Sequence, residues 1–334
     1  MKIYTSEGWV NWDYILSQKS SFISVVGARG VGKTYGVMRK LIESGEKFIY
    51  LRRLKSQLDQ CGKAEGNPFK KLNTDMDRNI LPFPTGGMIT FRENDKAGDV
   101  AAAGVALSVV ANVRGIDFSD YNYIVFDEFI ASAGERPIKN EFAAFLNFYE
   151  TVNRNRELEG RDPVKCIMLG NANTLVNPYF SSWHFMKTAI RMITGNQMVW
   201  RSSDGSRMVI LLLNSPISEK KKETALYQNA DSDFIQMALD NSFRTDETNI
   251  KSEPLREYVH IVSVGEIGIY KHKSERKYYV SSTQSVPYYD SFGIGLKMFQ
   301  QDYYMLRVHY MVSKNVWFES FELEIIFREL FDLR

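Results

Sequence analysis

The chain has 334 residues, of which 44% are hydrophobic and 25% are charged, with 42 basic residues against 40 acidic ones and a formal net charge of +2. This length predicts two compact units, and the composition excludes a long disordered tail, a fibrous repeat and a histone-like polycation. The charge balance gives no reason to expect nucleic acid as a partner, because non-specific binding to nucleic acid usually shows as a basic surplus.

Cysteine usage and the N-terminus predict a soluble, cytoplasmic protein. Cys61 and Cys166 are too few for a disulfide framework and too far apart for a zinc knuckle, so we interpret both as reduced. Residues 1–8 lack the apolar segment of a secretory signal. The longest apolar stretch, residues 100–111, is shorter than the roughly 20 residues that cross a bilayer, so we expect no membrane contact.

The first half of the chain alternates short apolar runs with helix-length segments, which is the pattern of a parallel sheet covered by helices. The predicted core strands are apolar throughout, as strands buried on both faces are. They are residues 22–26, 48–51, 123–126 and 164–169. A hairpin is predicted between residues 88–92 and 105–110. A helix from Glu141 has apolar residues at helical spacing and is predicted to pack on the sheet.

The second half has a different pattern. A strand is predicted at residues 207–213, and the charged run at 218–223 is interpreted as part of a connection. After about residue 230 we predict a short helix, three strands and a closing amphipathic helix. The strands are residues 258–264, 267–271 and 276–281, and the helix surrounds residues 317–330. The predicted organisation is therefore a domain at 1–198, a linker or lid at 199–228 and a smaller α+β domain at 229–334.

The segment between the first predicted strand and the next helix matches the phosphate-binding pattern G-x-x-x-x-G-K-[ST]. It consists of Gly27, Ala28, Arg29, Gly30, Val31, Gly32, Lys33 and Thr34. Glycines let backbone N–H groups close around a β-phosphate, and the helix N-terminus adds the positive end of its dipole. In this arrangement Lys33 is predicted to bridge the β- and γ-phosphates, and Thr34 is predicted to ligate Mg²⁺.

The predicted strand 123–126 ends in an acidic pair, Asp127 and Glu128. Asp127 at a buried strand end is suited to hold the Mg²⁺ shell, and Glu128 is suited to polarise the water that attacks the γ-phosphate. The sequence lacks the N-K-x-D pattern that selects guanine. We therefore expect ATP as the nucleotide, bound by a P-loop fold of the additional-strand, catalytic-glutamate class.

Five further polar residues are candidates for the same site, each with an alternative. Asn171 follows the predicted strand at 164–169 and could orient the attacking water or simply form an Asx-turn. Arg154 and Arg156 follow the predicted helix, and either could be offered to the phosphate of a neighbouring subunit or remain solvated. Arg52 and Arg53 end the second strand and could face the nucleotide or a carboxylate.

Several of these segments together resemble a known family. They are residues 26–33, residues 48–53, the "VFDEFI" run at 125–130, the "RNRE" run at 154–157 and the "NPYF" run at 177–180. In these runs the chain resembles the genome-packaging motor ATPases of small short-tailed phages, the Picovirinae group. The resemblance covers about residues 22–182 and is weak beyond them.

The resemblance implies an ATP-driven translocase of double-stranded DNA that works as a pentameric ring on the portal of an empty capsid in the host cytoplasm. It implies that Arg154 is a trans-acting arginine finger and that Lys55 faces DNA in the channel. It also implies that the second domain is a degenerate RNase H-like nuclease, and residues 258–263 carry no acidic residue for a metal. In the family that domain can contact a packaging RNA, and whether this chain uses RNA stays open.

Two other functions remain open at this stage. One is a helicase or another DNA-remodelling ATPase of the P-loop class, and the other is a nucleotide-gated scaffold without turnover. The presence of Glu128 favours hydrolysis over the scaffold. The run of Lys220, Lys221 and Lys222 is interpreted as a solvated face, with a DNA-binding patch as the alternative.

Overall fold

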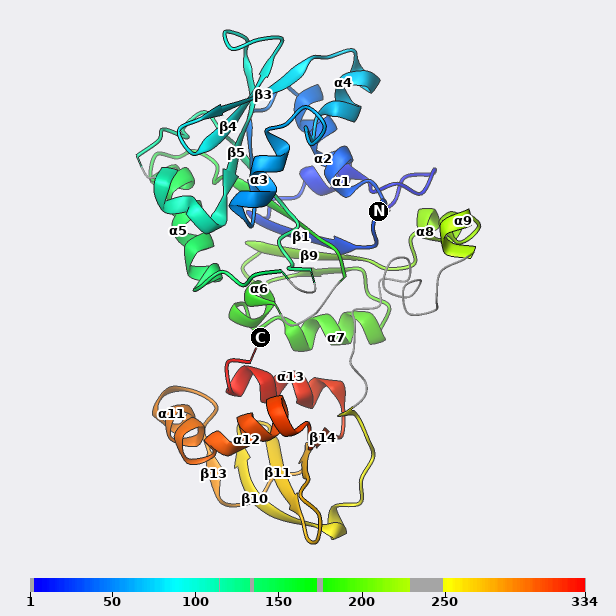
Figure 1. Cartoon of the computed structure of the whole chain (residues 1–334), viewed down its shortest axis with the longest axis vertical. Helices are drawn as coiled ribbons and strands as arrows, with labels where there is room; N and C mark the ends of the chain where they lie inside the picture. The colour runs from blue at the N-terminus through cyan, green and yellow to red at the C-terminus, as the bar shows by residue number, and fades with distance from the viewer. Residues whose placement is uncertain (1–2, 114, 133–134, 173–176, 229–248, 334) are drawn as a thin grey trace. The chain divides into compact units, whose positions relative to one another are not determined.

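The computed structural model describes residues 3–113, 115–132, 135–172, 177–228 and 249–333, which form two units (Figure 1). The first unit comprises Met1–Leu175 and Arg191–Phe243, and the second comprises Val176–Ile190 and Arg244–Arg334. The short helix predicted after residue 230 falls on residues 229–248, outside the described residues. In the described part of the chain, no helix is both long and apolar enough to span a membrane.

The first unit is built on a nine-stranded sheet with the order β3-β4-β5-β2-β6-β7-β1-β9-β8. From β5 to β9 all neighbouring strands are parallel, whereas β3, β4 and β8 join the sheet edges in antiparallel pairs. The strands are β1 (Phe22–Gly27), β2 (Phe48–Arg52), β3 (Ile80–Thr85), β4 (Met88–Glu93), β5 (Val100–Ala106), β6 (Tyr123–Asp127), β7 (Lys165–Gly170), β8 (Val199–Arg201) and β9 (Arg207–Leu212). The four predicted core strands are confirmed as β1, β2, β6 and β7.

The predicted linker at 199–228 was wrong in its first half, because β8 and β9 belong to this sheet. β9 pairs in parallel with β1, and Met208 to Leu212 are buried, as in the other core strands. An apolar run of this kind cannot stay in a solvated linker without exposing its surface to water. The first unit therefore continues past residue 198.

The predicted hairpin was partly wrong, because β4 pairs with β5 at Val100–Ala106 and the following Leu107–Val113 forms a 3₁₀ segment, η1. The alanines of β5 have low strand propensity, so sequence pattern alone does not indicate that this segment pairs between β2 and β4. The sequence also gave no sign of β3, which contains Pro82 and Pro84. Prolines are tolerated there because β3 is an edge strand.

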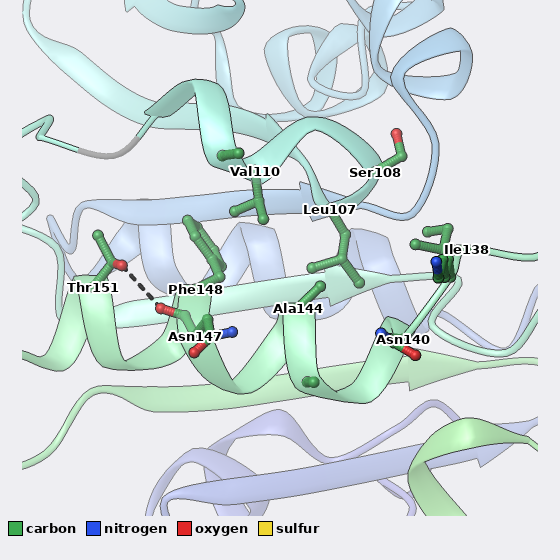
Figure 2. A pocket seen from close by; sticks show the side chains of 12 residues that line it. Leu107, Ser108, Val110, Ile138, Asn140, Ala144, Asn147, Phe148 and Thr151 are labelled. Carbon is green, nitrogen blue, oxygen red and sulfur yellow. Dashed lines mark hydrogen bonds between the residues drawn. The ribbon is translucent and has the colours of Figure 1, made fainter.

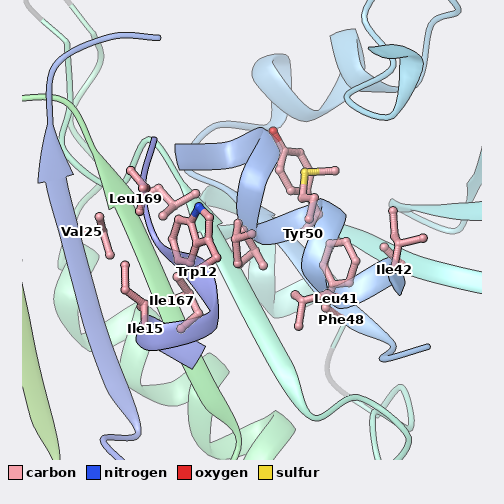
Figure 3. Packing of buried hydrophobic residues seen from close by; sticks show 14 of the residues in the cluster. Trp12, Ile15, Val25, Leu41, Ile42, Phe48, Tyr50, Ile167 and Leu169 are labelled. Atoms are coloured by element: carbon pink, nitrogen blue, oxygen red, sulfur yellow. The ribbon is translucent and has the colours of Figure 1, made fainter. Parts of the chain in front are cut away.

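Helices of the first unit cover both faces of the sheet, and the packing of α1 and α2 on it is shown in Figure 3. Helix α2 buries Val37, Met38 and Leu41, while α5 buries Phe145, whose ring stacks on Phe126 of β6 at 5.7 Å between centroids. The helices are α1 (Trp12–Leu16), α2 (Lys33–Glu43), α3 (Lys55–Cys61), α4 (Lys70–Met76), α5 (Glu141–Asn153), α8 (Pro216–Lys222) and α9 (Ala225–Gln228). Helix α7 (Met186–Thr194) crosses the division between the units at Ile190.

The second unit has a five-stranded mixed sheet with the order β13-β10-β11-β12-β14. Strands β10, β11 and β12 form an antiparallel meander, β13 is parallel to β10, and β14 is parallel to β12. The strands are β10 (Tyr258–Val264), β11 (Ile267–His272), β12 (Tyr278–Ser281), β13 (Tyr288–Tyr289) and β14 (Val316–Phe318). The three predicted strands are confirmed as β10, β11 and β12.

Helices α11 (Gly293–Asp302), α12 (Tyr304–Val308) and α13 (Phe321–Leu330) contribute to a core that includes Val262, Ile269 and Phe327. The second unit also contains α6 (Pro178–Ser182) and the short η3 (Leu255–Glu257) and η4 (His309–Ser313). The closing helix was predicted to start too early, because residue 317 lies in β14. The helix begins after Ser320, whose side chain accepts a hydrogen bond from the backbone N–H of Leu323 as an N-cap.

Candidate nucleotide-binding site

The phosphate-binding loop connects β1 to α2 and is held in place by close backbone packing. Gly30 and Gly32 have φ angles of +68° and +86°, a backbone conformation that residues other than glycine rarely adopt. A Cβ on Gly27 would lie 2.6 Å from Leu212 of β9, so the strand beside the loop also requires glycine. Trp12 Nε1 donates to the carbonyl oxygen of Gly32 at 3.2 Å, which fixes the point where α2 begins.

Lys33, the first residue of α2, folds back over the loop. Its Nζ donates to the carbonyl oxygens of Gly27 and Ala28 at 2.9 and 2.6 Å and to Oδ1 of Asn171 at 3.1 Å. Burial lowers the pKa of Lys33 to about 7, while Asp127 opposes that shift. A bound phosphate would favour the charged ammonium, because an anion nearby raises the pKa of a lysine.

Thr34 and Asp127 lie side by side in the orientation that a shared cation requires. Thr34 Oγ1 donates to Oδ1 of Asp127 at 2.8 Å. The other carboxylate oxygen, Oδ2, accepts from the Tyr50 hydroxyl at 2.8 Å and from Arg52 Nη1 at 2.9 Å. Hydroxyl and carboxylate oxygens are ligands that Mg²⁺ accepts, so the donor set fits this metal.

Glu128 is positioned by an uncommon backbone conformation at the end of β6. Its φ is +55°, and the next residue, Phe129, donates from its N–H to Leu169 O at 3.1 Å, so the chain turns sharply after β6. The Glu128 side chain is 42% exposed, and its Oε2 accepts from Arg52 Nη2 at 2.6 Å. Such strain is retained where the surrounding structure enforces it, and it is concentrated at functional sites.

These groups share one cavity of about 390 Å³ between the phosphate-binding loop and the carboxyl ends of β6 and β7. It is lined by Arg29, Gly30, Gly32, Lys33, Thr34, Tyr35, Asp127, Glu128, Leu169, Gly170 and Asn171. The side chains that the two sequence motifs singled out thus meet in one place, although residues 34 and 127 are far apart in the chain. The cavity brings the glycine-rich loop, a lysine, a hydroxyl and two carboxylates together, which are the groups that phosphoryl transfer to water uses.

A second cavity of about 340 Å³ lies between η1 and α5 (Figure 2). Its lining includes Leu107, Val110 and Phe148, and Thr151 Oγ1 donates to the carbonyl oxygen of Asn147 at 2.8 Å within α5. Among its described lining residues Lys139 carries a charge and none is acidic. This cavity lacks the carboxylates that line the first one.

The two arginines proposed as a trans-acting finger, Arg154 and Arg156, differ in exposure and in their contacts. Arg154 forms the C-cap of α5 with a φ of +46°, and its half-exposed side chain donates to Ile116 O at 3.2 Å. Arg156 is 5% exposed and donates to the carbonyl oxygens of Ser119 and Tyr121 at 2.8 and 2.7 Å. Arg156 therefore holds a loop together, whereas Arg154 lies on the surface outside the loop cavity.

The structure also gives Arg52, Arg53 and Lys55 different surroundings. Arg52 faces the carboxylates of the loop cavity, as described above, which is the second of its two predicted alternatives. Arg53 is 2% exposed and forms a bidentate pair with Glu141 of α5, at 2.8 and 2.9 Å. Lys55 begins α3, is exposed and pairs with Asp59, away from the residues that line the loop cavity.

Sequence reasoning missed three residues at or near this site. Tyr50 contacts Asp127, Tyr35 lines the cavity, and Lys221 of α8 donates from Nζ to Arg29 O at 2.7 Å. Tyr35 could have been found, because it directly follows the motif. The contacts of Tyr50 and Lys221 depend on sheet order and on the placement of α8, which no local pattern indicates.

The chain is similar to known proteins in sequence and in fold. The profile of the podovirus DNA encapsidation protein (Gp16) family matches residues 6–310. The DNA packaging protein of Bacillus phage phi29 is 34% identical over 182 residues, which are 53% of this chain and 48% of that protein. The matched segment thus spans about half the length of the curated relative.

Two solved structures resemble the chain along nearly its whole length. The Phi-28 gp11 DNA packaging motor gives a TM-score of 0.60 at 19% identity and covers 99% of both chains. The bacteriophage Phi-29 viral genome packaging motor assembly gives a TM-score of 0.59 at 24% identity and covers 98% of this chain and 100% of that one. At these identities the likeness shows a shared fold, which extends through both units.

Proposed function

Because this chain belongs to the podovirus DNA encapsidation protein (Gp16) family, we propose that it is the ATPase of a viral packaging motor that drives double-stranded DNA into a preformed procapsid. The observation that carries the proposal is the convergence of Lys33, Thr34, Asp127 and Glu128 on one cavity. The order of the sheet supports the additional-strand, catalytic-glutamate class, because β7 lies between the strand that leads into the loop and the strand that ends in the acidic pair.

In the proposed reaction, backbone N–H groups of the loop hold the phosphates of ATP and Lys33 leaves its carbonyl partners to contact them. Thr34 and Asp127 would hold Mg²⁺, which neutralises charge that develops on the phosphate oxygens. Glu128 accepts a proton from the attacking water, and the amide of Asn171 orients that water or contacts the γ-phosphate. These roles account for the two motifs and for the polar end of β7.

Arg52 holds the carboxylates that this reaction requires. In the structure its guanidinium contacts both Asp127 and Glu128. The Glu128 oxygen that accepts from Arg52 Nη2 at 2.6 Å is occupied by this contact and is not available to the attacking water. We therefore expect Glu128 to leave Arg52 before it activates water.

We propose that Arg154 acts in trans, on the nucleotide of a neighbouring copy in a homomeric ring, which we expect to be a pentamer. Its exposure and its position at the end of α5 support this role. An arginine supplied in trans accelerates phosphoryl transfer by roughly 10³ to 10⁵. The buried contacts of Arg156 argue against the same role for that residue.

The proposed partners are double-stranded DNA, with Lys55 in the channel, and the portal of the procapsid. The exposed position of Lys55 at the start of α3 supports a contact with DNA phosphates. We expect the protein in the host cytoplasm and transiently on the procapsid. A packaging RNA as a further partner would make packaging sensitive to ribonuclease.

We also propose that the second unit is a degenerate nuclease domain of the RNase H-like type. Its antiparallel meander β10-β11-β12, with β13 added in parallel beside β10, supports this. Strand β10, which lies between β13 and β11, carries no carboxylate at which such a nuclease would bind metal.

Steady-state turnover of the purified full-length chain tests the proposed function. We expect Mg²⁺-dependent ATP hydrolysis that rises with DNA and procapsid, and the substitution Glu128→Gln should keep ATP binding while it slows hydrolysis by about 10²-fold or more. Unwinding of a duplex in a strand-displacement assay would favour a helicase instead. Turnover indistinguishable from zero, with DNA and procapsid present, would favour a nucleotide-gated scaffold.

A further inference from the structure

The lysine run at the end of α8 places its three side chains in different environments. Lys220 and Lys222 are exposed, and Lys222 pairs with Glu219 at 3.0 Å. Lys221 is half-buried, and its Nζ donates to the carbonyl oxygen of Arg29 at 2.7 Å. One lysine of a run that looked like a solvated face therefore reaches the phosphate-binding loop.

Packing against the N-terminal segment holds α8 beside this loop. The hydroxyl of Tyr4 donates to Leu213 O at 2.9 Å, shortly before α8 begins. Pro216, the first residue of α8, lies so close to Gly8 that a Cβ there would be 2.8 Å from it. The same N-terminal segment leads into α1, which contacts the loop through Trp12, so the position of α8 does not depend on Lys221 alone.

The loop leaves room for the Lys221 ammonium because residue 30 is glycine. A Cβ on Gly30 would clash with Nζ of Lys221, so a side chain at this position would displace the end of the lysine. An ammonium has three N–H donors, so its bond to Arg29 O leaves capacity for another acceptor. Gly30 itself lines the loop cavity, so an anion bound there comes within short reach of Lys221.

The positive charges gathered at the loop favour a polyanionic ligand. Burial lowers the pKa of Lys221, whose ammonium lies at the same loop as Arg29 and Lys33. Three cationic groups gathered at one loop repel one another until an anion lies between them. A phosphate chain supplies several negative oxygens for these cations, whereas a single carboxylate supplies one negative charge.

We propose that Lys221 is a phosphate-binding residue outside the loop, whose ammonium exchanges the Arg29 carbonyl for an oxygen of the nucleotide's phosphate chain and so fastens α8 to the bound nucleotide. This inference rests on the proposed function, since it requires that the loop bind ATP. It means that α8 is held more firmly while a nucleotide is bound than when the loop is empty. The segment after β9 thereby registers the nucleotide state.

Nucleotide binding by full-length variants tests the role of Lys221. Lys220→Ala is the matched control, because it removes the same charge one residue away from an exposed position. We expect Lys221→Ala to weaken the binding of ATPγS by about tenfold, since a charge-assisted hydrogen bond is lost, and Lys220→Ala to change it by less than about twofold. A loss with ATPγS alone assigns the contact to the γ-phosphate, and an equal loss with ADP assigns it to the phosphates nearer the ribose.

Hydrogen exchange of residues 216–222 gives a second measurement that does not depend on activity. ATPγS should slow exchange in the wild-type chain and in Lys220→Ala, but not in Lys221→Ala. Equal affinities and equal protection in the two variants would overturn the inference. In that case the proposed function still stands if wild-type protein binds ATPγS and Lys33→Ala does not, whereas absence of binding by the wild type would defeat both.

Discussion

Arg52 donates from Nη2 to Oε2 of Glu128 at 2.6 Å, while its Nη1 contacts Oδ2 of Asp127 at 2.9 Å. One guanidinium therefore spans the two acidic residues to which we assign metal binding and water activation. Arg52 is 12% exposed and Asp127 is 10% exposed, so the pair they form is largely shielded from solvent. The relationship makes separate predictions for stability and for turnover.

Replacing Arg52 with alanine should raise DNA-independent ATP turnover several-fold, because Glu128 is no longer held in an ion pair. The same change should destabilise the first unit by about 3 kcal/mol, because Asp127 stays buried after losing its partner. Turnover by purified protein and denaturant unfolding measure the two effects. Arg52→Lys is the control, since an ammonium cannot span both carboxylates as a fork. Turnover below wild type in a folded Arg52→Ala protein would mean that Arg52 takes part in hydrolysis.

Part of this site could be predicted from sequence because the information is local. The loop at 27–34 and the acidic pair at 127–128 each follow an apolar strand, and the carboxyl ends of parallel strands meet at one edge of a sheet. The sequence could not decide whether Arg52 faces the nucleotide or a carboxylate. The contacts of Arg52 depend on β2 lying beside β6, and several sheet orders are compatible with the same strand pattern.

Long-range packing explains the remaining differences between sequence and fold. Lys221 was grouped with its neighbours because a run of lysines carries no sign of which one faces the protein. β9 was assigned to a linker because its parallel partner, β1, lies far away in the chain. The net charge of +2 gave no reason to expect nucleic acid as a partner, yet the chain belongs to a family of DNA encapsidation proteins. A net charge sums over all surfaces and does not show where basic side chains gather.

Removal of the Thr34 hydroxyl should weaken the response to Mg²⁺. Thr34→Ala deletes the oxygen that lies 2.8 Å from Oδ1 of Asp127, so the proposed cation site loses one ligand. We expect the Mg²⁺ concentration for half-maximal turnover to rise about tenfold, in line with the loss of one metal ligand. Thr34→Ser keeps the hydroxyl and should stay near wild type. Matching Mg²⁺ titrations of the alanine and serine variants would remove Thr34 from the cation site.

Alanine substitution should lower the stability of the first unit much more at Arg156 than at Arg154. Arg156→Ala should destabilise the first unit by about 2 kcal/mol, because the buried guanidinium and its hydrogen bonds to the carbonyl oxygens of Ser119 and Tyr121 are lost. Arg154→Ala should change stability by less than about 0.5 kcal/mol, because its side chain is half-exposed. Denaturant unfolding measures both.

ATP turnover in assembled rings tests whether Arg154 acts in trans. Arg154→Ala should abolish most hydrolysis in a homogeneous ring, and mixing it with Glu128→Gln subunits, which keep an intact Arg154, should restore part of the activity. The rescue arises because an Arg154→Ala subunit keeps its Glu128 and would receive Arg154 from a neighbouring Glu128→Gln copy. Normal turnover by Arg154→Ala rings would contradict the trans assignment.

Glu329 of α13 should make the stability of the second unit depend on pH. Burial raises its pKa to about 7, against the opposing charge of Lys187, and its Oε1 has no hydrogen-bond partner among the described residues. The folded unit therefore favours the protonated acid. The stabilising contribution is complete below the unfolded pKa, about 4.3, and is lost as the pH rises through about 7.

Glu329→Gln removes this ionisation while keeping the size of the side chain. We expect it to stabilise the second unit by about 1 kcal/mol at pH 8, after allowance for solvent screening of a partly exposed carboxyl, and to leave stability nearly unchanged at pH 5. Hydrogen exchange of the buried amides of β11 at the two pH values reports on this unit within the full chain. Glu322→Gln, on the first turn of the same helix, removes an equal charge and should give no gain at pH 8. A Glu329→Gln effect of equal size at both pH values would show that packing, and not ionisation, sets the contribution of this residue.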